Sequence, residues 1–178
     1  MATIDLIVLG MLKQKALSAY DIQKLVEYRN ISKWVRISTP SIYKKVIQLE
    51  EKGLITSHME KDGKMPEKAV YSLTDAGKEE FERLMLEISR KPIHIFLDLN
   101  AVIVNLESMT KEKQRECLEH IERNIHELKA YLEEDIALKE NAPAIPAMGM
   151  AVLQQQSRLV QAIEEWIAAL KEEVVKSS

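Results

Sequence analysis

Apolar residues at the start of the chain recur at three- and four-residue intervals, which is the spacing of one face of an α-helix. They predict a first helix over residues 4–12 and a second helix over residues 19–28. Ser18 and Asp21 stand where a capping box would open the second helix, since each side chain can bond the backbone N–H of the other residue. The chain therefore begins with two short helices whose apolar faces need a common core.

A third helix is predicted to begin at Thr39 and Pro40, residue types that are preferred at the N-cap and first-turn positions. Ile42, Val46 and Leu49 follow at i, i+4 and i+7 and form its buried stripe. The opposite face is predicted to be polar and basic, with Ser41, Lys44, Lys45 and Gln48. A short helix with a basic face near its start suits insertion into the major groove of DNA.

A β-hairpin is predicted to follow this helix. Gly53 ends the helix at the position where a left-handed residue is common, and residues 54–60 and 69–73 form two extended strands. The hairpin tip carries Lys61, Lys64 and Lys68. Thr74 then caps a fourth helix. This order of helix, helix and basic hairpin is typical of a winged helix-turn-helix domain.

The second half of the chain is predicted to be helical throughout. Residues 118–132 and 153–174 each carry apolar positions that step by three and four, the pattern of a helix seam. The apolar run from Ile93 to Leu106 is predicted to be a further, buried helix. Because a hairpin of two amphipathic helices leaves apolar surface uncovered, a second subunit is expected to cover it. The predicted dimer interface comprises Leu153, Val160, Ile163, Ile167, Leu170 and Val174.

These elements predict a mainly α protein with two domains. Residues 1–90 would form a winged helix-turn-helix DNA-binding domain with a two-stranded wing, and residues 91–178 an all-helical, coiled-coil-like dimerisation domain. The first domain holds 15 Lys and Arg against 13 Asp and Glu, and the second 10 against 15. A net charge of −3 is compatible with DNA binding, because the local field on one face decides it.

Three stretches of the first domain resemble the signature stretches of PadR-like transcriptional regulators. They are Leu17–Ile22, Ser41–Ile55 and Val70–Lys78. The resemblance implies a dimeric repressor that binds operator DNA through its winged helix, with Tyr43 on the DNA backbone. Ala19 stands where the family often has Gly, and Lys64 and Lys68 stand where Arg is common, which affects the details of the wing contacts. The predicted DNA-binding residues are Ser38, Thr39, Ser41, Tyr43, Lys44, Lys45, Gln48, Lys61, Lys64 and Lys68.

Other chemistry-bearing residues give weaker signals. The four histidines do not form a metal-binding set, and neither a cofactor-binding motif nor a catalytic constellation is present, so an enzyme is not expected. Cys117 is the only cysteine, which excludes an internal disulfide; with no signal peptide in the sequence, a cytoplasmic protein is expected. Trp34 and Trp166 are either core residues or contacts for a small planar effector.

The expected partners are a pseudo-palindromic double-stranded operator, a second copy of the chain and a small-molecule effector. Two alternatives keep the same fold. The chain could be a regulator of another winged-helix family, or a winged-helix module that binds proteins, because a fold does not by itself define a function. Salt-dependent binding to operator DNA distinguishes the second alternative from the main reading.

Overall fold

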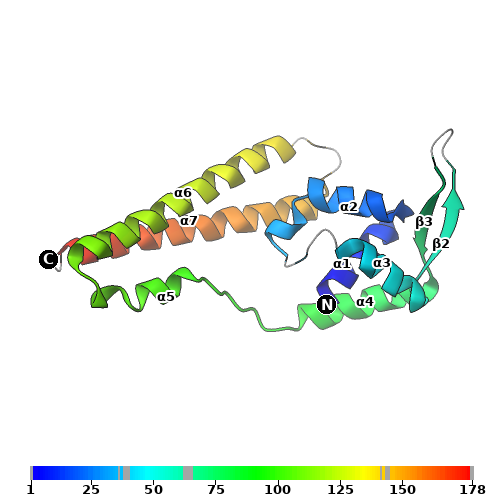
Figure 1. The fold of residues 1–178 in the computed structure, drawn as a ribbon, viewed down its shortest axis with the longest axis horizontal. Helices are drawn as coiled ribbons and strands as arrows, with labels where there is room; N and C mark the ends of the chain where they lie inside the picture. Colours follow the sequence, from blue (N-terminus) through cyan, green and yellow to red (C-terminus); the bar gives the residue numbers. More distant parts are fainter. Residues whose placement is uncertain are drawn as a thin grey trace. The chain divides into compact units, whose positions relative to one another are not determined.

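The computed structural model describes residues 2–35, 37, 41–61, 66–140, 142 and 145–176. The chain divides into two compact units, residues 1–93 and residues 94–178. The first unit contains, in chain order, α1 (Ala2–Gln14), β1 (Leu17–Ser18), α2 (Ala19–Tyr28), the short 3-10 helix Ile31–Lys33, α3 (Ser41–Glu51), β2 (Ile55–Glu60), β3 (Lys68–Leu73) and α4 (Asp75–Ser89) (Figure 1).

The core of the first unit lies where α1, α2 and α3 meet the sheet and α4. Ile42, Val46 and Leu49 of α3 are fully buried, as are Ile22 of α2 and Leu9 of α1. The predicted stripe of the third helix is thus confirmed. It fixes which face of α3 is left for a partner, because a helix that buries one stripe must expose the other.

The sheet has three antiparallel strands in the order β1-β3-β2. The hairpin of β2 and β3 matches the predicted wing, with Ile55 opposite Leu73 and Glu60 opposite Lys68. The sequence analysis did not predict β1, in which Leu17 and Ser18 pair with β3. Two residues are too few to produce the alternating pattern that marks a strand.

Local side-chain and backbone rules fix the ends of these elements. Ser18 and Asp21 form the predicted capping box at the start of α2. Thr74 caps α4, its hydroxyl accepting a hydrogen bond from the Gly77 N–H at 3.1 Å and donating one to the Gly53 carbonyl at 2.7 Å. Gly53 has a φ of +70°, the left-handed conformation expected at the end of α3. Thr74 thereby ties the start of α4 to the end of α3. The proposed cap at Thr39 and Pro40 lies outside the described residues.

The second unit contains α5 (Leu99–Ile103), a short 3-10 helix (Leu106–Ser108), α6 (Lys111–Lys139) and α7 (Ala147–Lys176). The two long helices run antiparallel as a hairpin (Figure 1). Their seam is formed by Leu118, Ile125 and Leu132 of α6 with Val160 and Ile167 of α7. Two ion pairs cross the seam at 2.6 Å each, Lys129–Glu164 and Lys171–Glu122.

Part of the predicted dimer interface packs inside this hairpin, and its role between subunits stays a prediction. Val160 and Ile167 are only 5% and 1% exposed within one chain, and Ile163, Leu170 and Val174 pack partly against the same cluster. Leu153 is buried as well. The α6 helix of the same chain therefore covers part of the apolar side of α7, since a heptad-like ladder requires a covering helix without specifying which chain supplies it.

The prediction of a buried helix from Ile93 to Leu106 is wrong. The chain has no regular secondary structure from Ile93 to Leu97, and α5 is only five residues long. Ile93, Phe96 and Val104 are 91%, 79% and 80% exposed. An apolar run without a clear period cannot distinguish a long helix from an irregular segment, and here an irregular stretch precedes a single short helix. Within the described part of the chain, no helix is long and apolar enough to cross a membrane.

Candidate nucleic-acid interface

The free face of α3 consists of an aromatic, a basic and an aliphatic side chain. Tyr43 and Ile47 are 44% and 54% exposed and lie one turn apart, and Lys44 beside them is also exposed. Ser41 and Gln48 are half-buried at the margins of this face. Lysine and tyrosine can bond phosphate oxygens, and an aliphatic side chain can contact a thymine methyl group. Ile47 was absent from the predicted site because apolar residues were assigned to the core.

Lys45 does not belong to this face, which corrects the sequence prediction. Its Nζ lies 2.6 Å from Oδ1 of Asp5 in α1, and the side chains are 8% and 14% exposed. The spacing already contained this signal, since Lys45 lies three residues after Ile42 and four before Leu49, on the buried stripe. Lys45 therefore anchors α3 to α1, whereas its neighbour Lys44 is the residue that can reach DNA.

The α2 helix, the first helix of the helix-turn-helix motif, adds a group that is not among the residues predicted from the sequence. Lys24 lies with its Nζ 5.5 Å from the centroid of the Tyr20 ring and 3.1 Å from a carboxylate oxygen of Glu27. The Glu27 carboxylate raises the pKa of Lys24, and Tyr20 and Tyr43 act on it in the same direction. Tyr20 is 57% exposed. The aromatic side chains of α2 and α3 thus gather around one lysine, and the signal that could have revealed them is the polar face of α2.

The start of β3 is attached to the N-terminal turn of α2. Nζ of Lys68 lies 3.5 Å from Oδ2 of Asp21, which also accepts a 2.6 Å hydrogen bond from the Ser18 hydroxyl. The Ser18 hydrogen bond lowers the pKa of Asp21, and Lys68 lowers it further. Lys68 remains 48% exposed, so it can serve both Asp21 and a phosphate. Lys61 is exposed where β2 ends. Ser38, Thr39 and Lys64 of the predicted site lie outside the described residues.

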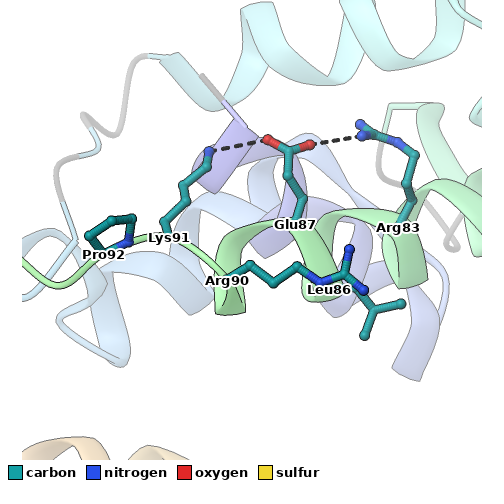
Figure 2. A pocket seen from close by; sticks show the side chains of 6 residues that line it. All are labelled: Arg83, Leu86, Glu87, Arg90, Lys91 and Pro92. Atoms are coloured by element: carbon teal, nitrogen blue, oxygen red, sulfur yellow. Dashed lines mark hydrogen bonds and ion pairs between the residues drawn. The ribbon is translucent and has the colours of Figure 1, made fainter.

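A pocket of about 510 Å³ lies at the end of α4, away from the α3 face in sequence and in its lining. Figure 2 shows Glu87 held between Arg83 and Lys91, with oxygen–nitrogen distances of 2.7 and 3.2 Å. These cations lower the pKa of Glu87, Lys91 more strongly than Arg83. Arg83 is also paired with Glu80 at 2.6 Å. Carboxylates thus neutralise Arg83 and Lys91, as is usual for an exposed helix with alternating charges.

The two tryptophans and the cysteine that the sequence singles out lie outside the α3 face. Trp34 packs against the core of the first unit, whereas Trp166 is 40% exposed and lines a pocket in the second. Cys117 is half-buried against the α6–α7 seam. Among the residues that the structure describes, no three His, Cys, Asp or Glu side chains are grouped to hold a metal ion.

A buried tri-helical core, a free helix face and a β-hairpin tied to the motif's first helix together define a winged helix-turn-helix protein. Residues 8–83 match the model of the transcriptional regulator PadR-like family. The match covers this first unit, which is therefore similar to a family of transcription regulators. No curated protein matches the sequence.

Solved structures share the fold over nearly the whole chain. Bacillus subtilis PadR in complex with operator DNA has a TM-score of 0.82 and 19% identity, covering 97% of this chain and 99% of that one. The same protein in complex with p-coumaric acid has a TM-score of 0.78 and 18% identity, with coverages of 96% and 94%. The Vibrio cholerae virulence activator AphA has a TM-score of 0.73 and 20% identity, with coverages of 98% and 99%. At these identities the likeness shows the fold.

Proposed function

We propose that this protein is a sequence-specific DNA-binding repressor that acts as a homodimer in the cytoplasm. In this proposal α3 enters the major groove, and the wing and the exposed side of α2 rest on the flanking phosphates. The observation that carries the proposal is the free face of α3. Tyr43, Lys44 and Ile47 are exposed there, while the opposite stripe is fully buried.

The arrangement supports a division of labour within the interface. Lys44 and Ile47 lie where an inserted helix meets base edges, whereas Lys24, Lys61 and Lys68 surround it at positions suited to phosphate contacts. Phosphate contacts set the register of the protein on DNA and dominate the salt dependence, and base contacts set the sequence preference. Affinity and specificity should therefore respond to different substitutions.

A homodimer is supported by the apolar surface that each chain leaves uncovered. With the α6–α7 seam closed, the large exposed apolar side chains of the second unit include Phe96 and Val104. A monomer rarely exposes contiguous apolar surface without a partner. We place the subunit contact at Phe96 and Val104. A two-fold dimer would then present two copies of α3 to the half-sites of a pseudo-palindromic operator.

Regulation by a small molecule completes the proposal. It is supported by the structure of Bacillus subtilis PadR with p-coumaric acid, a likeness in fold. We propose that an effector releases this protein from its operator. The Vibrio cholerae relative is described as an activator, so transcription from the selected operator, with and without the protein, is the measurement that tests repression.

The test begins with DNA selected from a random pool by the full-length protein, followed by titrations at several salt concentrations. Lys44→Ala should weaken binding and reduce the slope of log K against log salt by about 1 if Lys44 contacts a phosphate, or cost about 1–3 kcal/mol at one base position if it reads a base. Lys113→Ala is the matched control, an exposed lysine in the other unit whose removal should leave the affinity unchanged. Salt-insensitive binding, or no selection of DNA by the wild type, would instead favour a protein-binding module.

A further inference from the structure

An apolar pocket of about 440 Å³ lies in the second unit and has no role in the proposed DNA contacts. It is lined by Ile95, Leu97, Asn100, Leu128, Gln156, Leu159, Val160, Ala162, Ile163 and Trp166. A smaller hollow of about 220 Å³ shares Leu97, Leu128, Val160 and Ile163 with it and adds Asn124 among its other lining residues. The volume of the larger pocket falls within the range of about 300–1,000 Å³ that is usual for small-molecule sites.

The walls of this pocket come from three segments of one chain. Ile95 and Leu97 form one wall, whereas Phe96 between them does not line the pocket and is 79% exposed. This alternation is that of an extended segment, whose successive side chains point to opposite sides. Ile95 and Leu97 thus border the pocket, with Ile95 itself 67% exposed, and Phe96 does not border it. A second copy packed on Phe96 would leave the pocket free for another occupant.

The lining defines the chemistry of that occupant. None of the pocket's lining residues carries a charge, and the polar side-chain groups are the amides of Asn100 and Gln156 and the indole N–H of Trp166. Gln156 is half-buried in the α7 ladder between Leu153 and Val160, where an apolar residue would pack without desolvating an amide. The indole of Trp166 supplies a flat wall. An amide pair beside an indole in an otherwise aliphatic site fits a flat molecule with its own donor and acceptor groups.

We propose that this pocket binds an uncharged, planar aromatic molecule that hydrogen-bonds to Gln156 and Asn100 and packs against Trp166. A carboxylate is disfavoured, because no cation lines the pocket to compensate for its desolvation. The pocket would then be the site of the proposed effector. An effect of this ligand on DNA binding rests on the proposed function, whereas ligand binding itself can be measured without DNA.

The test compares two probes of equal shape, 2-naphthamide, which is neutral, and 2-naphthoate, which is an anion. Calorimetry on the full-length protein should show saturable binding of the amide and at least about tenfold weaker binding of the anion, the loss expected for one unfavourably desolvated charge. Gln156→Leu, similar in size, should weaken the amide about tenfold through one lost hydrogen bond and leave the anion unchanged. Ala162→Phe, which fills the pocket from an exposed position, should abolish binding of both.

Fluorescence places the bound probe. The chain has two tryptophans, so Trp34→Phe leaves Trp166 as the only reporter, and its emission should be quenched by 2-naphthamide in proportion to occupancy. Equal affinities for the two probes, unchanged binding by Ala162→Phe, or no binding to the wild type would each overturn the proposal. If acrylamide cannot quench Trp166 in the unliganded dimer, a second copy of the chain fills the pocket, and this result would also overturn the proposal. DNA titrations without probe test the proposed function separately, so either idea can fail alone.

Discussion

Replacing Lys45 by alanine should destabilise the first unit severely, although the residue lies next to Lys44 in sequence and has the same charge. Its Nζ is 2.6 Å from Oδ1 of Asp5, and neither side chain is more than 14% exposed. Removing the ammonium would leave the Asp5 carboxylate buried without its counter-charge. If Lys45 were an ordinary surface lysine, Lys45→Ala would reduce only the affinity for DNA and leave the stability unchanged.

The magnitude follows from the desolvation of the remaining carboxylate. Breaking a buried ion pair by deleting one partner typically costs about 3–5 kcal/mol. Because Asp5 retains slight solvent contact, about 3 kcal/mol is expected for Lys45→Ala. For a unit of this size, that corresponds to a fall in melting temperature of about 12–24 °C. Removing both charges, as in Asp5→Leu with Lys45→Met, should restore most of the stability, because an apolar pair of similar volume has no charge to desolvate.

Urea unfolding followed by circular dichroism, together with thermal melting, measures this difference. Lys44→Ala is the matched comparison, and it should unfold at the wild-type urea concentration while losing DNA affinity. The reasoning about α3 would be refuted if Lys45→Ala changed the free energy of unfolding by less than about 0.5 kcal/mol, the usual size of a surface substitution. It would also be refuted if the double variant were less stable than Lys45→Ala alone.

Three further substitutions test other parts of the structure. Gly77→Ala should prevent normal folding of the α3–α4 region, since the new Cβ would lie 1.9 Å from the Leu54 carbonyl oxygen, and proteolysis of the variant at the wild-type rate would contradict this. Phe96→Glu should yield monomers in sedimentation experiments without loss of helix content, whereas a stable dimer would move the subunit contact elsewhere. Asp21→Asn should lower the melting temperature at neutral pH but not at strongly acidic pH. The pKa of Asp21 is lowered below its ordinary 3.8 by the Ser18 hydroxyl, so its stabilising effect is present above 3.8 and is lost as the pH falls through the folded-state pKa. Equal losses at both pH values would show that the charge of Asp21 is unimportant.

Local rules explain why much of the first unit could be predicted from sequence. The capping box at Ser18 and Asp21, the Thr74 cap and the left-handed Gly53 each depend on atoms within about three residues. The spacing of Ile42, Val46 and Leu49 is equally local, because the helical period alone aligns them. Such signals do not require knowledge of which elements pack together.

Errors arose where the outcome depends on partners distant in sequence. The charge of Lys45 suggests an exposed position. Its spacing from Ile42 and Leu49 instead places it on the buried stripe of α3, where it pairs with Asp5 of α1. The two-residue strand β1 exists only because β3 offers it backbone partners. In the candidate interface, Lys24 and Tyr20 were missed because α2 was read only for its buried face.

The predicted dimer interface depends on which chain covers the apolar ladder of α7, and this decides which surface is left for a partner. The apolar residues along one face of α7 are stable only when another helix packs on them. In this chain α6 packs on them through Leu118, Ile125 and Leu132. With the seam closed, Met148, Leu159 and Trp166 of α7 are still 75%, 39% and 40% exposed, so α7 keeps apolar surface outside the seam. Phe96 and Val104, which are 79% and 80% exposed, offer a partner further apolar surface outside α7. The same closure of the seam leaves the pocket beside Trp166 within one subunit, and this makes its ligand binding separable from dimerisation by experiment.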